Sequence, residues 1–250
     1  MTLDPQAQAL LEQMKAMGFS YTPELTVTTA REMLQAMLAV RPVGESVASV
    51  ENRSIPGPAG DIPVRIYSLE DSYEATKWVV THAPEFGGDP SRIAIVGDSS
   101  GGNMATVVTL LARDRGGPKL AFQLLMFPAT DFRLSTPSME ELGEGYNVTK
   151  AQMIWIRNNY LPNPADWTNP LAPPLLAPDL SGLPPVLIIY AEYDPLRDDA
   201  EAYAARLKEA GVSVKASRYD GMIHDFIDLF EEPGERALAE IAYALRAAFA

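Results

Sequence analysis

The alternation of apolar with amphipathic segments is the feature of this 250-residue sequence that most constrains its fold. Four short segments are expected to form strands, three of them almost continuously apolar: 92–96, 120–127, 186–191 and 212–219. Helical periodicity is expected between and after them, over 101–113, 198–210 and 235–249. Apolar strands separated by helices need cover on both faces, so the pattern predicts an α/β fold with a mostly parallel sheet flanked by helices.

The chain before residue 92 also carries recognisable segments. Amphipathic helices are expected over 5–17 and 28–39, and a further helix over 70–82. Two strands are expected over 47–55 and 62–67, separated by a turn of proline and glycine between residues 56 and 60.

One region does not follow the alternation of strands and helices. Residues 135–183 are rich in proline and aromatic residues, with a helix expected near 149–160. The prediction is therefore a core made of 46–134 and 184–250, with 135–183 inserted over the sheet as a cap. The N-terminal helices within 1–45 are expected to join this cap.

Composition excludes several classes of function. With 33 acidic and 20 basic residues the net charge is −13, which disfavours binding to nucleic acid and to anionic membranes. The absence of cysteine excludes disulfides, thiolate catalysis and cysteine-based metal sites. The N-terminus lacks the basic and apolar regions of a signal peptide, so a cytoplasmic protein is expected, and the glycosylation-type triplet that begins at Asn147 is read as chance.

A G-x-S-x-G pattern, formed by Gly97, Ser99 and Gly101, stands between an expected strand and an expected helix. In this context a serine occupies a sharp turn that exposes its hydroxyl above the sheet. Glycine removes Cβ atoms that would collide in such a turn. The backbone N–H of Ser100 would then point from a helix N-terminus at a developing oxyanion. Ser99 is the predicted nucleophile.

A serine nucleophile requires a base, and the chain has two histidines. His224 follows the strand expected to end near Tyr219, and therefore lies at the carboxyl edge of the sheet, where ligands and catalytic groups gather. His82 ends a helix that precedes the Ser99 strand, which places it at the opposite edge. His224 is the predicted base, and His82 is expected to be a surface or helix-capping residue.

The base in turn requires a carboxylate that selects its tautomer. Asp194 directly follows the strand 186–191 and is the predicted acid. Glu192 and Asp198 are its rivals, although Asp198 is expected to cap the next helix. The order serine, aspartate, histidine is the α/β-hydrolase order of triad members.

These segments together resemble the hormone-sensitive-lipase-like esterases, also called bacterial family IV, of the α/β-hydrolase superfamily. The heptapeptide GDSSGGN at 97–103 is similar to the family's nucleophile elbow, DPLRD at 194–198 to its acid motif, and GMIH at 221–224 to its histidine motif. The resemblance runs from about residue 5 to 250. It implies a serine esterase acting on short acyl chains, without cofactor or metal and often as a homodimer.

The sequence departs from this family at one place. Members carry a His-Gly-Gly-Gly-type motif, followed by a further helix and strand, where this chain runs from Ser68 directly into Leu69. About two strands and one loop that donates to the oxyanion are therefore expected to be missing. Loss of one donor costs on the order of 10²–10³ in rate. Gly87-Gly88 precedes its strand and lies at the wrong edge to replace the loop, whereas residues 67–72 are a candidate only if they fold against Ser99.

Two functions follow from this sequence. The first is a serine carboxylesterase acting on small esters, with amide or lactone hydrolysis as variants. The second is a catalytically silent or impaired fold, acting as an interaction module or surviving as a fragment, with a lipid- or ligand-binding role as a further alternative.

Overall fold

The computed structural model describes residues 2–16, 26, 28–29, 32, 54–57, 60–63 and 69–250. Most of the expected helix over 28–39, and most of the expected strands over 47–55 and 62–67, lie outside these residues. The described parts of the two strands, β1 (Ser54–Gly57) and β2 (Gly60–Pro63), form an antiparallel pair. The strands thus run closer to the turn than the sequence predicts, because the proline and glycine residues at 56, 57 and 60 are themselves paired.

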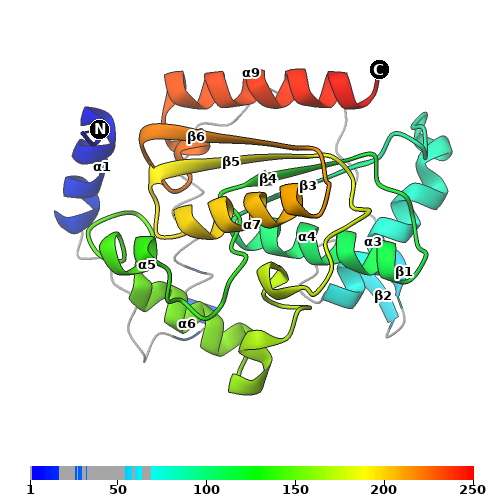
Figure 1. Ribbon diagram of the computed structural model, residues 1–250, viewed down its shortest axis with the longest axis horizontal. Coiled ribbons are helices and arrows are strands. Elements are labelled where there is room, and N and C mark those ends of the chain that lie inside the picture. The colour runs from blue at the N-terminus through cyan, green and yellow to red at the C-terminus, as the bar shows by residue number, and fades with distance from the viewer. Residues whose placement is uncertain are drawn as a thin grey trace.

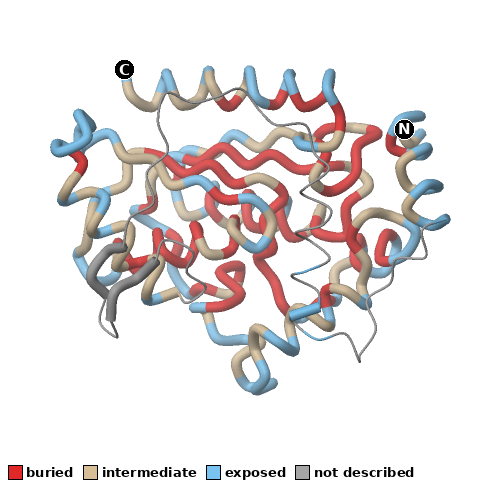
Figure 2. The backbone as a smooth tube through the Cα atoms, turned by 180° about the vertical axis from the view of Figure 1, so that it is seen from behind, coloured by how far each residue is buried: buried red, intermediate tan, exposed pale blue. Residues whose placement is uncertain are grey.

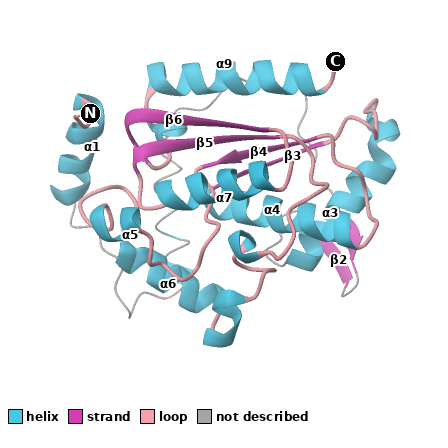
Figure 3. Ribbon diagram, viewed as in Figure 1, coloured by secondary structure: helices cyan, strands magenta, loops and turns pink. Residues whose placement is uncertain are grey.

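The main sheet has four parallel strands in the order β3-β4-β5-β6 (Figures 1 and 3). Its strands are β3 (Ala94–Asp98), β4 (Phe122–Met126), β5 (Val186–Tyr193) and β6 (Val214–Ile223). This confirms the predicted parallel α/β architecture. β6 extends four residues beyond the predicted end at 219, through Asp220 and Gly221. A register irregularity between Ala191 and Tyr193 of β5 accompanies this extension.

Helices cover both faces of the sheet, as the continuous apolar strands require (Figure 1). The longer helices are α1 (Pro5–Ala16), α3 (Leu69–His82), α4 (Ser99–Asp114), α6 (Lys150–Tyr160), α7 (Arg197–Glu209) and α9 (Glu231–Ala248). The short ones are α5 (Pro137–Glu141), α8 (Phe226–Leu229), and the 3₁₀ helices η1 (Ala83–Phe86), η2 (Pro164–Thr168) and η3 (Pro174–Leu176). None of the helices in the described residues is long and apolar enough to cross a membrane.

Alternate residues of β5 divide the core into two layers. Ile188 and Tyr190 pack toward α4 and α7, whereas Leu187, Ile189 and Ala191 pack toward α9 and α1. This two-sided burial places β5 at the centre of the molecule, and Figure 2 shows the buried stretch running through the sheet. A rigid, fully packed strand of this kind can hold the residues at its carboxyl end in fixed positions.

One edge of the main sheet is formed by β3. Among the described strands, β3 pairs with β4 alone. The side chain of Val96, in the middle of β3, is 50% exposed, unusually high for an apolar residue of a sheet covered by helices. The strand that leads to Ser99 is therefore the outermost of the described strands on this side of the sheet.

Candidate active site

The turn between β3 and α4 presents Ser99 as the first residue of the helix. Ser99 has a φ of 48°, a left-handed conformation that is unfavourable for a residue with a side chain and is retained chiefly where function requires it. A Cβ on Gly97 would overlap the carbonyl oxygen of Gly101, so position 97 admits only glycine. The turn is therefore built to hold a serine in a strained, outward position.

The glycines of the elbow do not share one role. A Cβ on Gly102 would approach Pro128 to 2.9 Å, whereas a Cβ on Gly101 would meet its nearest neighbour, an Asp98 oxygen, at an ordinary 3.5 Å. Close approach of the chain thus explains glycine at 97 and 102. The expectation that both glycines flanking Ser99 are needed to avoid collision is wrong for Gly101.

The structure brings Ser99, His224 and Asp194 together at the carboxyl ends of three strands. His224 Nε2 lies 3.0 Å from Ser99 Oγ, and His224 Nδ1 lies 2.7 Å from Asp194 Oδ2. Asp194 is fully buried and His224 is 5% exposed. Because a carboxylate only accepts, Nδ1 carries the proton in this arrangement, which leaves Nε2 of the neutral ring free to accept the Ser99 hydroxyl proton.

Asp194 is held by its own turn. The backbone N–H of Leu196 donates to Asp194 Oδ1 at 2.8 Å, so the two carboxylate oxygens have different partners. Phe127, which follows β4, packs its ring against the His224 ring at 4.7 Å between centroids. A buried apolar wall on one side and a carboxylate on the other fix the plane of the imidazole.

The pKa of His224 reflects two opposing effects. Burial lowers it, whereas the negative charge of Asp194 and its hydrogen bond to Nδ1 raise it. Asp225 and Asp98 add smaller effects in the same direction as Asp194. The carboxylates prevail, and the pKa of His224 stands above its usual 6.5.

The rival residues have other partners. Glu192 accepts a hydrogen bond from the Gly221 N–H at 2.8 Å, and Asp198 accepts one from the Ser138 N–H at 2.7 Å. His82, at the end of α3, donates from Nδ1 to the Trp78 carbonyl at 2.8 Å and stacks on the Trp78 ring. Glu192 and Asp198 thus bind backbone N–H groups, and His82 binds within its own helix.

Ser100 is the second residue of α4, so its N–H belongs to the first turn, whose amides have no partner within the helix. This is the position that the sequence assigns to the oxyanion donor. Within the described ranges, no group of three or more histidine, aspartate and glutamate side chains could hold a metal ion.

Two contacts of the site have no signal in the sequence. Asn147, which the sequence suggests only as a chance glycosylation triplet, donates from Nδ2 to the His224 carbonyl at 3.0 Å. Asp199, five residues after Asp194, is buried and accepts hydrogen bonds from the N–H groups of Thr130 and Asp131 at 3.1 and 2.9 Å. Both depend on packing between segments about 70 residues apart, which periodicity and motifs do not report.

The chain is similar to known proteins over most of its length. The α/β-hydrolase fold family matches residues 58–228. The chain is 33% identical over 312 residues to the carboxylic ester hydrolase LipN of Mycobacterium tuberculosis, covering 98% of this chain and 83% of LipN. It is 42% identical over 217 residues to the carboxylesterase NlhH of the same species, covering 80% of this chain and 64% of NlhH.

Solved structures of an α/β-hydrolase and of an esterase are also similar to this chain. An α/β-hydrolase enzyme from the metagenome of Lake Arreo, in a serine-to-alanine form, superposes with a TM-score of 0.90 at 30% identity, covering 99% of both chains. A hyperthermophilic esterase from the archaeon Pyrobaculum calidifontis superposes with a TM-score of 0.88 at 30% identity, also covering 99% of both. The elbow at Ser99, the parallel sheet and these matches together show that the chain belongs to the α/β-hydrolase fold family.

Proposed function

We propose that the protein is a serine carboxylesterase that hydrolyses short-chain carboxylic esters through an acyl-enzyme on Ser99. The observation that carries the proposal is the continuous pair of hydrogen bonds from Ser99 through His224 to Asp194, at 3.0 and 2.7 Å. LipN is named as a carboxylic ester hydrolase and the Pyrobaculum calidifontis structure as an esterase, and both match most of the chain, which supports the same reaction class.

Each residue of the site has a defined role in the proposed reaction. His224 Nε2 accepts the hydroxyl proton as Ser99 Oγ attacks the ester carbonyl, and the N–H of Ser100 donates to the oxyanion. His224 then returns the proton to the leaving alcohol, and Asp194 stabilises the imidazolium in between. Water, deprotonated by His224, attacks the acyl-enzyme; His224 then returns this proton to Ser99 Oγ as the bond to the acyl group breaks and the acid is released. All the protons in this scheme pass through Nε2.

The segment 135–183, together with residues 1–45, is proposed to form a cap over this site, and 46–134 and 184–250 the core. In Figure 1, α1, α5 and α6 lie toward the carboxyl ends of the strands, the side on which Ser99 stands. A cap at this position would enclose the acyl group and favour small esters.

We also propose that the segment with the second oxyanion donor is missing between residues 68 and 69. The match to LipN extends over 312 residues, more than the 250 of this chain, so LipN carries residues with no counterpart here. The position of β3 at the sheet edge supports the same conclusion. A rate lower by on the order of 10²–10³ than that of a complete relative is the expected consequence.

Hydrolysis of p-nitrophenyl butyrate tests the proposal. Wild-type protein should turn over the ester, and Ser99→Ala should lower kcat roughly 10⁴-fold or more. Ser91→Ala is the matched control, because Ser91 is an exposed serine that hydrogen-bonds Asp89 before β3, at the opposite edge of the sheet. Folded protein without Ser99-dependent turnover would favour the silent fold instead.

A further inference from the structure

The segment between β4 and β5 contacts two turns of the site. The acid turn is formed by residues 194–198, and the base turn by residues 224–225. The contacts come from two side chains nine residues apart, Ser138 in α5 and Asn147 before α6. One side chain bonds to the turn of the acid, and the other to the turn of the base. Neither touches Ser99.

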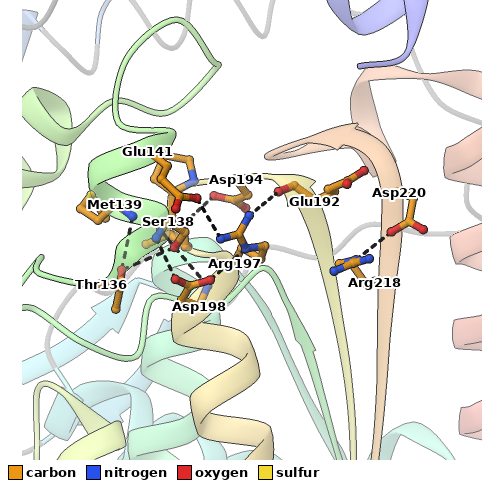
Figure 4. Close-up of polar contacts among 12 residues, drawn as sticks. Thr136, Ser138, Met139, Glu141, Glu192, Asp194, Arg197, Asp198, Arg218 and Asp220 are labelled. Carbon is orange, nitrogen blue, oxygen red and sulfur yellow. Dashed lines mark hydrogen bonds and ion pairs between the residues drawn. The ribbon is translucent and has the colours of Figure 1, made fainter. Parts of the chain in front are cut away.

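Ser138 is fully buried and bonds to the acid turn through both its hydroxyl and its backbone N–H. Its hydroxyl donates to the Pro195 carbonyl at 2.7 Å and accepts from the Asp198 N–H at 3.2 Å. Its own N–H donates to Asp198 Oδ2 at 2.7 Å. Figure 4 shows Ser138 and Asp198 directed toward one another. These bonds join α5 to the residues that directly follow Asp194.

Asn147 fixes the turn of the base from the other side. Its Nδ2 donates to the His224 carbonyl at 3.0 Å, which restrains the peptide plane between His224 and Asp225. Asp225 has a φ of 67°, in the left-handed region that few residues with a side chain adopt, and the bond from Asn147 restrains the peptide that precedes it. Next to Asn147, the ring of Tyr146 packs on the ring of Tyr193, which precedes Asp194, at 5.5 Å between centroids.

We propose that Ser138 and Asn147 are positioning residues, through which the segment from α5 to α6 holds the acid turn and the base turn in the relative placement that aligns His224 with both Asp194 and Ser99. The inference rests on the proposed function. Proton transfer is sensitive to such alignment, since a displacement of about 1 Å can cost on the order of 10²-fold in rate.

The first test is Asn147→Ala, with Asn159→Ala as its matched control. Asn159 makes the same kind of bond, from its amide to the Trp155 carbonyl at 2.9 Å, but on the exposed side of α6. Asn147→Ala should lower kcat for p-nitrophenyl butyrate about tenfold while KM changes less than about threefold. Asn159→Ala should leave both constants at the wild-type values.

The pH profile separates positioning from a general loss of folded protein. Asp194, Asp225 and Asp98 are the charged groups that act on His224, and all three remain in Asn147→Ala. If the contact to Asp194 loosens, burial dominates and the rising limb of kcat/KM should move to lower pH. A partly unfolded sample would lose amplitude at every pH without moving the limb. An unmoved limb together with wild-type kcat in Asn147→Ala would overturn the role of Asn147.

Ser138→Ala provides an independent test, with Ser181→Ala as its control. Ser181 donates from its hydroxyl to Asp179 in an exposed turn before β5, at the far end of the sheet. Ser138→Ala should lower kcat about tenfold and slow labelling of Ser99 by a fluorophosphonate to the same degree. If Asn147→Ala does not fold, this pair decides the proposal: equal labelling rates in Ser138→Ala and Ser181→Ala would refute it.

The failure of this inference is distinguishable from the failure of the proposed function. Turnover that survives Ser99→Ala would remove the esterase mechanism and the positioning role together. Turnover that requires Ser99, but is the same in Asn147→Ala, Ser138→Ala and their controls, would leave the esterase standing and contradict the positioning role alone.

Discussion

His224 Nε2 lies 3.0 Å from Ser99 Oγ, although 125 residues separate them in the chain. The contact exists because β3 and β6, the outermost described strands of the main sheet, both end at the same side, with β4 and β5 between them. Ser99 begins the helix after β3, and His224 directly follows β6. A parallel sheet thus brings together the two groups that a serine hydrolase needs.

The pH dependence of activity should report the environment of His224. The base works only when neutral, and the Asp194 carboxylate holds its pKa above 6.5, so kcat/KM should rise with pH with a midpoint above 6.5. Asp194→Asn removes the charge that raises the pKa and leaves the burial that lowers it. The midpoint should therefore fall, and the rate should drop on the order of 10⁴-fold. A pH series of fluorophosphonate inactivation rates measures both, and an unchanged midpoint in the variant would count against the assignment of Asp194.

The glycines on the two sides of Ser99 should respond differently to alanine. Gly97→Ala places a Cβ against the Gly101 carbonyl and should cost about 3 kcal/mol or more of unfolding free energy, together with the activity. Gly101→Ala meets only an ordinary contact and lies within α4, where alanine is favoured, so its stability should stay within about 1 kcal/mol of wild type. Urea denaturation of the two variants checks this contrast, and equal losses would contradict it.

The oxyanion role of Ser100 belongs to its backbone, not to its hydroxyl. Ser100→Pro removes the N–H at the second residue of α4, in the first helical turn, where no bond within the helix is lost. It should lower kcat on the order of 10²–10³-fold. Ser100→Ala keeps the N–H and should remain within a few-fold of wild type. Similar rates for Ser100→Pro and Ser100→Ala, in protein with an unchanged melting temperature, would rule out this donor.

Asp199 should make stability fall as pH rises. Burial, assisted by the nearby charges of Asp131 and Asp194, holds the pKa of Asp199 well above the usual 3.8 despite two backbone hydrogen bonds that lower it. A carboxyl with a raised folded-state pKa contributes stability below pH 3.8, and this is lost as pH rises through the folded value.

Asp199→Asn should therefore flatten the dependence of unfolding free energy on pH above 3.8. The matched control is Asp179→Asn, since hydrogen bonds from Ser181 lower the pKa of the exposed Asp179 and give its linkage the opposite sign. Urea denaturation across pH 4–8 compares the variants. A slope in Asp199→Asn equal to that of wild type would contradict the assignment.

Much of the fold was predictable because its strands are buried on both faces. The apolar run at 186–191 identifies β5, and the helices at 70–82 and 198–210 are confirmed within a residue at either end. The placement of His224 and His82 at opposite edges also followed from strand order, and the structure puts His224 beside Ser99 and His82 at the end of α3.

Other features depend on tertiary contacts that a sequence pattern does not carry. β6 continues through Asp220 and Gly221, beyond the predicted end of the strand at 219. α9 begins at Glu231, ahead of the predicted 235, because Pro233 fits a first helical turn and Gly234 packs against the Ile227 carbonyl. α8 has only four residues, too few for a helical period to show. In β6 and α9 the predicted boundary therefore failed where glycine or proline lies inside the element.

The most direct test of the central claim is the site and rate of labelling by a fluorophosphonate, read by peptide mass mapping. The account predicts one label per chain, on Ser99, in wild-type protein. It predicts no label in Ser99→Ala, and labelling slowed by at least on the order of 10³-fold in His224→Ala. Labelling of another serine, or equal labelling of wild type and His224→Ala, would contradict the activation of Ser99 by His224.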